Sequence, residues 1–65
     1  MSIMSRIVQR SPCSANDASK IVDAIEAAKT VDGNAACRMA IRMLNSGFKP
    51  EDVEVVFRLI GEYFR

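Results

Sequence analysis

The chain has 65 residues and a formal net charge of +1, from 9 basic and 8 acidic side chains, and it contains 2 cysteines and no histidine. A chain of this length forms a single domain, close to the size at which one hydrophobic core only just offsets chain entropy. With two cysteines and no histidine, it lacks the ligands of a structural zinc site, and a Ser or Cys nucleophile lacks its commonest base. The sequence therefore predicts a protein that is not an enzyme and needs no metal or cofactor.

Residues 1–13 form an N-terminal arm or short helix, and the sequence leaves its conformation open. Four apolar residues recur at the spacing of a short helix: Ile3, Met4, Ile7 and Val8. Pro12 would end that helix, because the residue before a proline disfavours α geometry. A strand also fits, since strict alternation places Arg6 and Arg10 together on one face. Both conformations are kept as hypotheses for this segment.

Residues 14–65 are predicted to form one helical domain, because start and stop signals of helices recur along it. Ser14 followed three residues later by Asp17 is a capping-box pattern, and it begins the first helix. Gly47 follows the last periodic residue of the second helix, where a left-handed glycine commonly ends a helix. Pro50 suits the first turn of the third helix. We expect an all-α, compact three-helix unit with helices over residues 15–29, 34–46 and 50–64.

The first of these helices has a narrow apolar stripe of mostly small residues, which suggests that it only covers the other two. The stripe consists of Ala18, Ile21, Val22, Ile25 and Ala28. The second and third helices are expected to fold back on each other as a central hairpin through the turn at residues 45–50. Either Asp32 or Asn34 in the preceding loop would cap the second helix.

The two helices of the hairpin carry more apolar surface than one small core can bury. The second helix has an apolar arc of about 200°, roughly twice the width that one packed side needs. The third helix has a core face made of Val53, Val56, Phe57, Ile60, Tyr63 and Phe64. Outside that face, Val55 and Leu59 form a second apolar stripe one turn apart. Exposed surface of this extent on a small monomer is unusual, so a homodimeric helical bundle is predicted.

The residues expected to form the oligomer or partner interface lie on both helices of the hairpin. They are Met39, Ile41, Met43, Val55, Leu59 and Tyr63. Arg38 and Arg42, one turn apart, are expected to add a polar contact, by pairing with Glu54 or Glu62 of a second copy. The sequence thus indicates a small regulatory or adaptor protein that binds itself and another protein, for example as an antagonist of a transcription regulator.

An alternative hypothesis is a DNA-binding transcriptional regulator. If residues 3–10 formed a strand, the element order would resemble that of the ribbon-helix-helix regulators, and Arg6 and Arg10 would contact DNA from the basic arm. The turn at residues 45–50 superficially resembles that of a helix-turn-helix unit. Its second helix would present Glu51, Glu54 and Glu62, which phosphates repel.

Two further expectations concern the location of the protein. No apolar run approaches the roughly 18 residues of a membrane span, so no membrane partner is expected. The first ten residues contain Ser5, Arg6, Gln9 and Arg10 where a secretory signal needs an unbroken apolar segment. The sequence therefore predicts a cytoplasmic protein in which Cys13 and Cys37 remain reduced.

Overall fold

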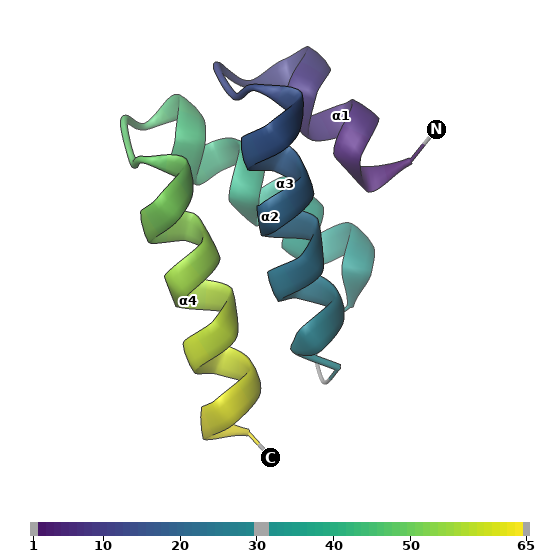
Figure 1. The fold of residues 1–65 in the computed structure, drawn as a ribbon, viewed down its shortest axis with the longest axis vertical. Coiled ribbons are helices and arrows are strands. Elements are labelled where there is room, and N and C mark those ends of the chain that lie inside the picture. The colour runs from purple at the N-terminus through teal and green to yellow at the C-terminus, as the bar shows by residue number, and fades with distance from the viewer. Residues whose placement is uncertain (1, 30–31, 65) are drawn as a thin grey trace.

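The structure is a computed structural model that describes residues 2–29 and 32–64 (Figure 1). Within these residues the chain forms α1 (Ile3–Arg10), α2 (Ala15–Ala27), α3 (Gly33–Asn45) and α4 (Pro50–Tyr63), and no strand. The predicted all-α class is confirmed. The three helices expected from the sequence correspond to α2, α3 and α4, with ends that differ by at most two residues, and α1 is a further helix.

The N-terminal segment is a helix, so the strand alternative for residues 3–10 is wrong. The Ser2 side chain accepts a hydrogen bond from the backbone N–H of Ser5 and caps α1. Ile7 is completely buried against the other helices, and Ile3 packs beside it. At the other end of α1, Asn45 Nδ2 donates to the backbone oxygen of Arg10 at 3.0 Å. The segment forms a helix and not a strand because helical spacing places both isoleucines on the one face that contacts the core.

The local signals that set the other helix ends act largely as the sequence predicted, although only one of the two bonds of the capping box at Ser14 and Asp17 forms among the described residues. The hydroxyl of Ser14 accepts from the backbone N–H of Asp17 and caps α2, and a carboxylate oxygen of Asp32 accepts from the N–H of Asn34 at the start of α3. Gly47 has φ of 101°, in the left-handed region that favours glycine. Pro50 occupies the first turn of α4, where its missing N–H leaves no bond unmade.

The centre of the fold is α2, which corrects the expectation that the α3–α4 hairpin is central and α2 only a cover. Helices α2 and α4 lie side by side with the most extensive contact in the molecule, α1 lies across one end, and α3 lies behind α2 (Figure 1). Helices α3 and α4 contact each other at few positions. The core residues are Ile7, Ala18, Ile21, Ala24, Ile25, Ala36, Cys37, Ala40, Leu44, Val53 and Phe57.

Small residues allow α4 to approach α2 closely. Gly61 is buried in the last turn of α4 and faces Ala28, the residue directly after α2. A Cβ atom added at Gly61 would lie 2.9 Å from Ala28 Cα and 3.1 Å from its Cβ. Real Cβ atoms do not approach backbone carbon so closely, so Gly61 is required by packing and not by a turn. The narrow, small-residue stripe of α2 therefore makes a tight helix contact.

Gly61→Ala is expected to destabilise the fold even though alanine favours helices by about 1 kcal/mol. The new methyl group meets backbone at Ala28, so α2 and α4 must separate and lose contact along their whole length. The expected net loss is about 1–2 kcal/mol in the free energy of unfolding, typical of overpacking. Urea unfolding followed by circular dichroism measures it.

Gly33→Ala is the matched control for this prediction. Gly33 opens α3, and a Cβ atom there would make an ordinary 3.4 Å contact with Ile3 Cδ1. We expect this change to alter the unfolding free energy by less than about 0.5 kcal/mol. If Gly61→Ala were as stable as the original chain, the close approach of α2 and α4 would not hold in solution.

Candidate protein-interaction surface

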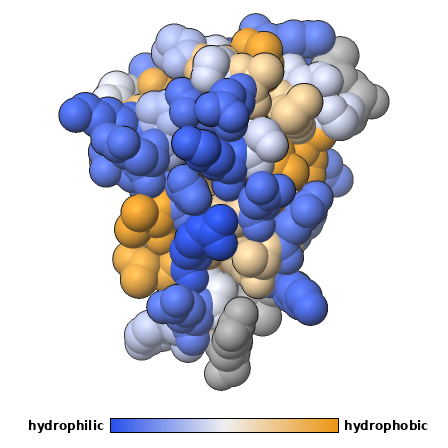
Figure 2. Space-filling model, in the orientation of Figure 1, coloured by the Kyte–Doolittle hydropathy of each residue, from blue (hydrophilic) through white to orange (hydrophobic). Residues whose placement is uncertain are grey.

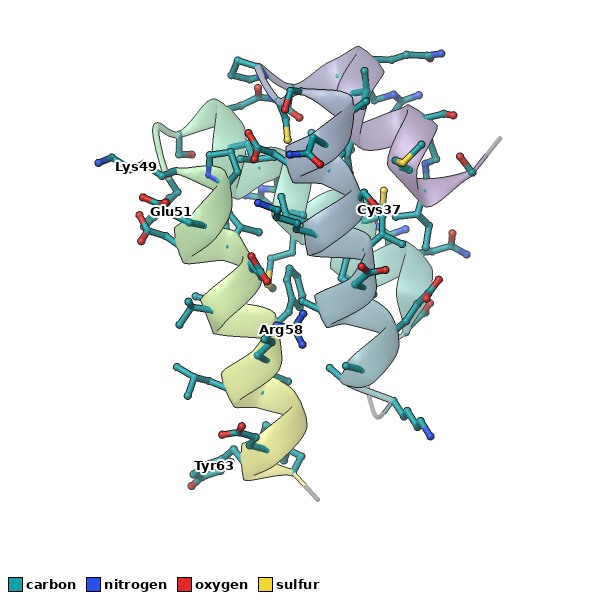
Figure 3. The ribbon with its side chains drawn as sticks, viewed as in Figure 1. Cys37, Lys49, Glu51, Arg58 and Tyr63 are labelled. Atoms are coloured by element: carbon teal, nitrogen blue, oxygen red, sulfur yellow. The ribbon has the colours of Figure 1, made fainter. Side chains whose placement is uncertain are left out.

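A row of exposed apolar side chains runs along the outer side of α4. Val55, Leu59 and Tyr63, called the ridge below, follow one another at intervals of four residues and are 53%, 57% and 82% exposed. Figure 2 shows hydrophobic atoms gathered at the edge of the molecule formed by α4, beside a mostly hydrophilic face. Figure 3 shows Tyr63 pointing away from the other helices. The second apolar stripe predicted on this helix thus lies at the surface of the folded chain.

An apolar groove of about 590 Å³ lies between α3 and α4, where the two helices separate. Its lining, called the groove below, consists of Asp32, Ala35, Ala36, Met39, Phe57, Ile60 and Phe64. Phe57 is almost completely buried at its floor, whereas Met39 on one wall and Phe64 on the other are 51% and 62% exposed. Alanines on α3 leave this space because their side chains are too short to reach α4. The groove is wide enough to receive apolar side chains of a partner.

The two sides of this surface carry different charges. On α3, Arg38 and Arg42 are exposed and line a hollow next to the groove, together with Met39, Met43 and Phe48. On α4, Glu62 lines a shallow apolar hollow with Leu59 and Tyr63. The surface is therefore apolar in the middle, basic along α3 and acidic near the end of α4.

Four of the six interface residues predicted from the sequence lie at the surface, namely Met39, Val55, Leu59 and Tyr63. Ile41 and Met43 are half-buried and pack against the core. The expectation that Tyr63 and Phe64 belong to the core face of α4 is wrong, because both are exposed. Tyr63 points away from the other helices, and Phe64 lines the groove opposite the start of α3, which does not come close enough to cover it. The two rings contact each other edge to face, with their centroids 5.0 Å apart.

Two exposed aromatic residues were not predicted as part of the surface. Phe64 was assigned to the core by its position on the helical wheel, which carries no information about how close the neighbouring helix comes. Phe48 lies in the turn between α3 and α4 and is 53% exposed. A phenylalanine in a short turn next to Gly47 is a sequence signal that could have identified it, since turns lie at the surface.

The arginines of the DNA-binding hypothesis lie on α1. Because α1 is a helix, Arg6 and Arg10 are one turn apart on a helix and do not lie on the outer face of a strand. Arg6 Nη1 donates to Asn34 Oδ1 of α3 at 3.0 Å, so part of its hydrogen-bonding capacity is used within the fold. The ribbon that the ribbon-helix-helix hypothesis requires is absent from residues 3–10.

A further hollow, between the start of α4 and the start of α2, is lined mainly by charged residues. Its lining consists of Asp17, Lys20, Lys49, Pro50, Glu51 and Glu54. Figure 3 shows Lys49 and Glu51 together at this end of the molecule. Acidic and basic groups alternate around it, so it has no consistent charge with which to select an ion.

No protein-family model, curated protein or solved structure matches this chain. Across residues 2–29 and 32–64, no helix has both the length and the apolar character needed to cross a membrane. Over the same residues, no three His, Cys, Asp or Glu side chains come together where they could hold a metal ion. The groove and the ridge are therefore the features of the described surface from which a function can be argued.

The two cysteines have different environments. Cys37 is completely buried between α3 and α1, near Ile3 (Figure 3). Cys13 is partly accessible in the segment between α1 and α2, and both thiols are free. Burial, and to a smaller extent the negative charge of Asp17, raise the pKa of the Cys13 thiol above its ordinary value. At neutral pH this thiol is therefore less reactive than a free cysteine, because the thiolate is the nucleophile.

Asp17→Asn is expected to increase the rate at which iodoacetamide alkylates Cys13 near pH 8. Removing the negative charge lowers the pKa of the thiol, so more thiolate is present at that pH, while the contribution from burial remains. Mass spectrometry of the labelled chain as a function of time and pH measures the rate. Cys37 serves as the internal control, since a completely buried thiol should stay unlabelled in both proteins. An unchanged pH dependence of Cys13 labelling would show that Asp17 does not act on this thiol.

Proposed function

We propose that this protein is a small, non-enzymatic regulator or adaptor of the cytoplasm, which works by binding another protein as a homo-oligomer, most simply a dimer. The observation that carries the proposal is the apolar surface formed by the groove and the ridge. Five of its residues, Met39, Val55, Leu59, Tyr63 and Phe64, are each more than half exposed. Continuous apolar surface of this kind marks an interaction site more often than a solvated face.

The shape and charge of the groove indicate the kind of partner. It is bounded by two helices, has an apolar floor at Phe57 and Ile60, and is bordered on the α3 side by Arg38 and Arg42. An amphipathic helix fits such a groove by placing apolar residues, three or four positions apart, between the walls. Acidic residues along one edge of that helix would face the two arginines. An inhibitor or antagonist that captures a helix of a regulatory protein is consistent with this arrangement.

DNA binding has less support from the same surface. The exposed polar side chains at the start of α4 include Glu51 and Asp52, which phosphates repel. The basic residues of α1 are few, and Arg6 already donates to Asn34. A protein partner with an apolar helix uses the groove, whereas a nucleic acid would leave its apolar walls in water.

The variant Met39→Glu with Phe64→Glu is expected to lose capture of the partner. The two side chains stand on opposite walls of the groove and are exposed, so the new charges block it without entering the core. Loss of two central apolar contacts should weaken binding by about 30-fold or more. The measurement is quantitative mass spectrometry of the proteins that the immobilised chain retains from an extract of its native cells.

Met4→Glu with Val8→Glu is the matched control, since it adds the same charge at two exposed apolar residues of α1, each 37% exposed. This variant should retain the same proteins as the original chain, and circular dichroism should show that both variants are helical. Retention of the same proteins in the same amounts by the groove variant would show that the groove is not the binding site. Retention of nucleic acid, lost at higher salt, would favour the DNA-binding alternative.

A further inference from the structure

The ridge has a spacing that is symmetric about its central residue. Val55 and Tyr63 lie four residues before and after Leu59, which corresponds to about 6 Å along the helix on either side. The three side chains are all more than half exposed, and they form a narrow strip along one side of α4. A narrow strip of this kind is typical of a seam between two packed helices and not of a pocket for a small ligand.

We propose that the ridge is the contact between two copies of this chain, with α4 of each copy packed antiparallel against α4 of the other. A two-fold axis perpendicular to α4 passes close to Leu59. Rotation about that axis places Leu59 against Leu59 of the partner subunit, and Val55 against Tyr63 of the partner subunit. The inference rests on the part of the proposed function that treats the protein as a homo-oligomer, and it specifies the surface and the geometry of that oligomer.

Charges beside the ridge support a second copy as its occupant. Arg58 and Glu62 lie on the same flank of α4, the one nearer α2, where they line a small hollow with Ala27 and Gly61. Arg58 is about 1.5 Å before Leu59 along the helix, and Glu62 is about 4.5 Å after it. The two-fold rotation reverses these positions, so Glu62 of the partner subunit lies within about 3 Å of the height of Arg58, on the same flank. The antiparallel pair thus brings opposite charges together twice.

Among residues 2–29 and 32–64 of one chain, Arg58 Nε contacts a single carboxylate oxygen, Glu54 Oε1 at 3.3 Å, and the Arg58 side chain is 48% exposed. Its remaining N–H donors are available to a carboxylate from a second copy. Glu62 is exposed, and no hydrogen bond to its carboxylate is made by residues 2–29 and 32–64. Besides Glu54, which Arg58 already contacts, the flank therefore presents the carboxylate of Glu62 beside an incompletely used cation, and an antiparallel copy brings these two opposite charges together.

Pairing through the ridge leaves the groove open. The groove lies on the α3 side of α4, whereas Arg58 and Glu62 lie on the other flank. A two-fold axis perpendicular to α4 and parallel to the contact keeps corresponding flanks of both copies on the same side. The dimer therefore presents two grooves on one side, and it can hold two copies of a partner helix or both halves of a dimeric partner.

Cysteine cross-linking tests the pairing and its direction in the full chain. In a Cys13→Ser background, where Cys37 is completely buried, Leu59→Cys should form a disulfide-linked dimer in a mild redox buffer. Val55→Cys should not cross-link with itself, because the two copies of that residue are separated by about 12 Å along the antiparallel helices. A mixture of Val55→Cys chains with Tyr63→Cys chains should give the mixed dimer. Self-cross-linking of Val55→Cys would show parallel helices and overturn the proposal.

Charge reversal gives a second, independent measurement. Arg58→Glu or Glu62→Arg alone should raise the dimer dissociation constant about fivefold, since each is introduced twice in the symmetric dimer. The double variant Arg58→Glu with Glu62→Arg should return it close to that of the original chain. Sedimentation equilibrium measures these constants, and circular dichroism confirms that each variant is helical. If the double variant were as weak as the single ones, the two side chains would not meet across the axis.

The failure of this proposal can be separated from the failure of the groove as a binding site. If the original chain remained at the mass of one copy, 7.2 kDa, up to its limit of solubility, the pairing would be overturned. Capture of a partner by the groove, and its loss in the Met39→Glu and Phe64→Glu variant, would still stand. Conversely, suppose that the chains cross-link in the expected register and that the groove variant still captures the partner. The proposed dimer would then stand, and the groove would be excluded as the binding site.

Discussion

The close contact between α2 and α4 determines the shape of the molecule. Gly61 and Ala28 bring the end of α4 within van der Waals distance of the chain that follows α2. Phe57 and Val53 continue this contact into the core, where both are buried. Because α4 is held against α2, it cannot also lie along α3, and the alanines of α3 cannot bridge the remaining distance. The groove is the direct consequence of packing one helix tightly on one side.

A chain of this size cannot cover the other sides of α4. Among the described helices, α2 buries one side of α4, and α3 covers it near Phe57. The remaining apolar residues of α4 would each contribute about 1.5–3 kcal/mol if fully buried, which is a large fraction of the stability of a small domain. The free energy that burial of these residues would release is the physical reason to propose that the surface binds other protein chains. A second copy and a partner helix can each bury a separate part of it.

The division of the surface into a ridge and a groove gives each part a different role. The ridge is a narrow strip flanked by charges of both signs, which suits a helix of the same kind running in the opposite direction. The groove is concave, apolar at its floor and basic at one edge, which suits an amphipathic helix with acidic residues. In the proposed arrangement, α4 contributes one side to the core, one to the partner subunit and one to the wall of the groove. Self-association and partner binding therefore do not compete for the same residues.

The sequence by itself determined the all-α class, the positions of α2, α3 and α4 to within two residues, and the local signals that begin these three helices and end α3. Caps such as Ser14 and Asp32, the left-handed Gly47 and Pro50 act within a few residues, so they can be recognised without knowledge of the rest of the fold. The exposed stripe of Val55 and Leu59 was also predicted, because it lies outside the widest core face that one neighbour can cover. The tertiary structure decided that α2 is central, that residues 3–10 are a helix, and that Tyr63 and Phe64 are exposed. These features depend on which helices meet and on how closely they approach each other. A helical wheel contains neither kind of information, because it records only the direction of each side chain around the axis of its helix.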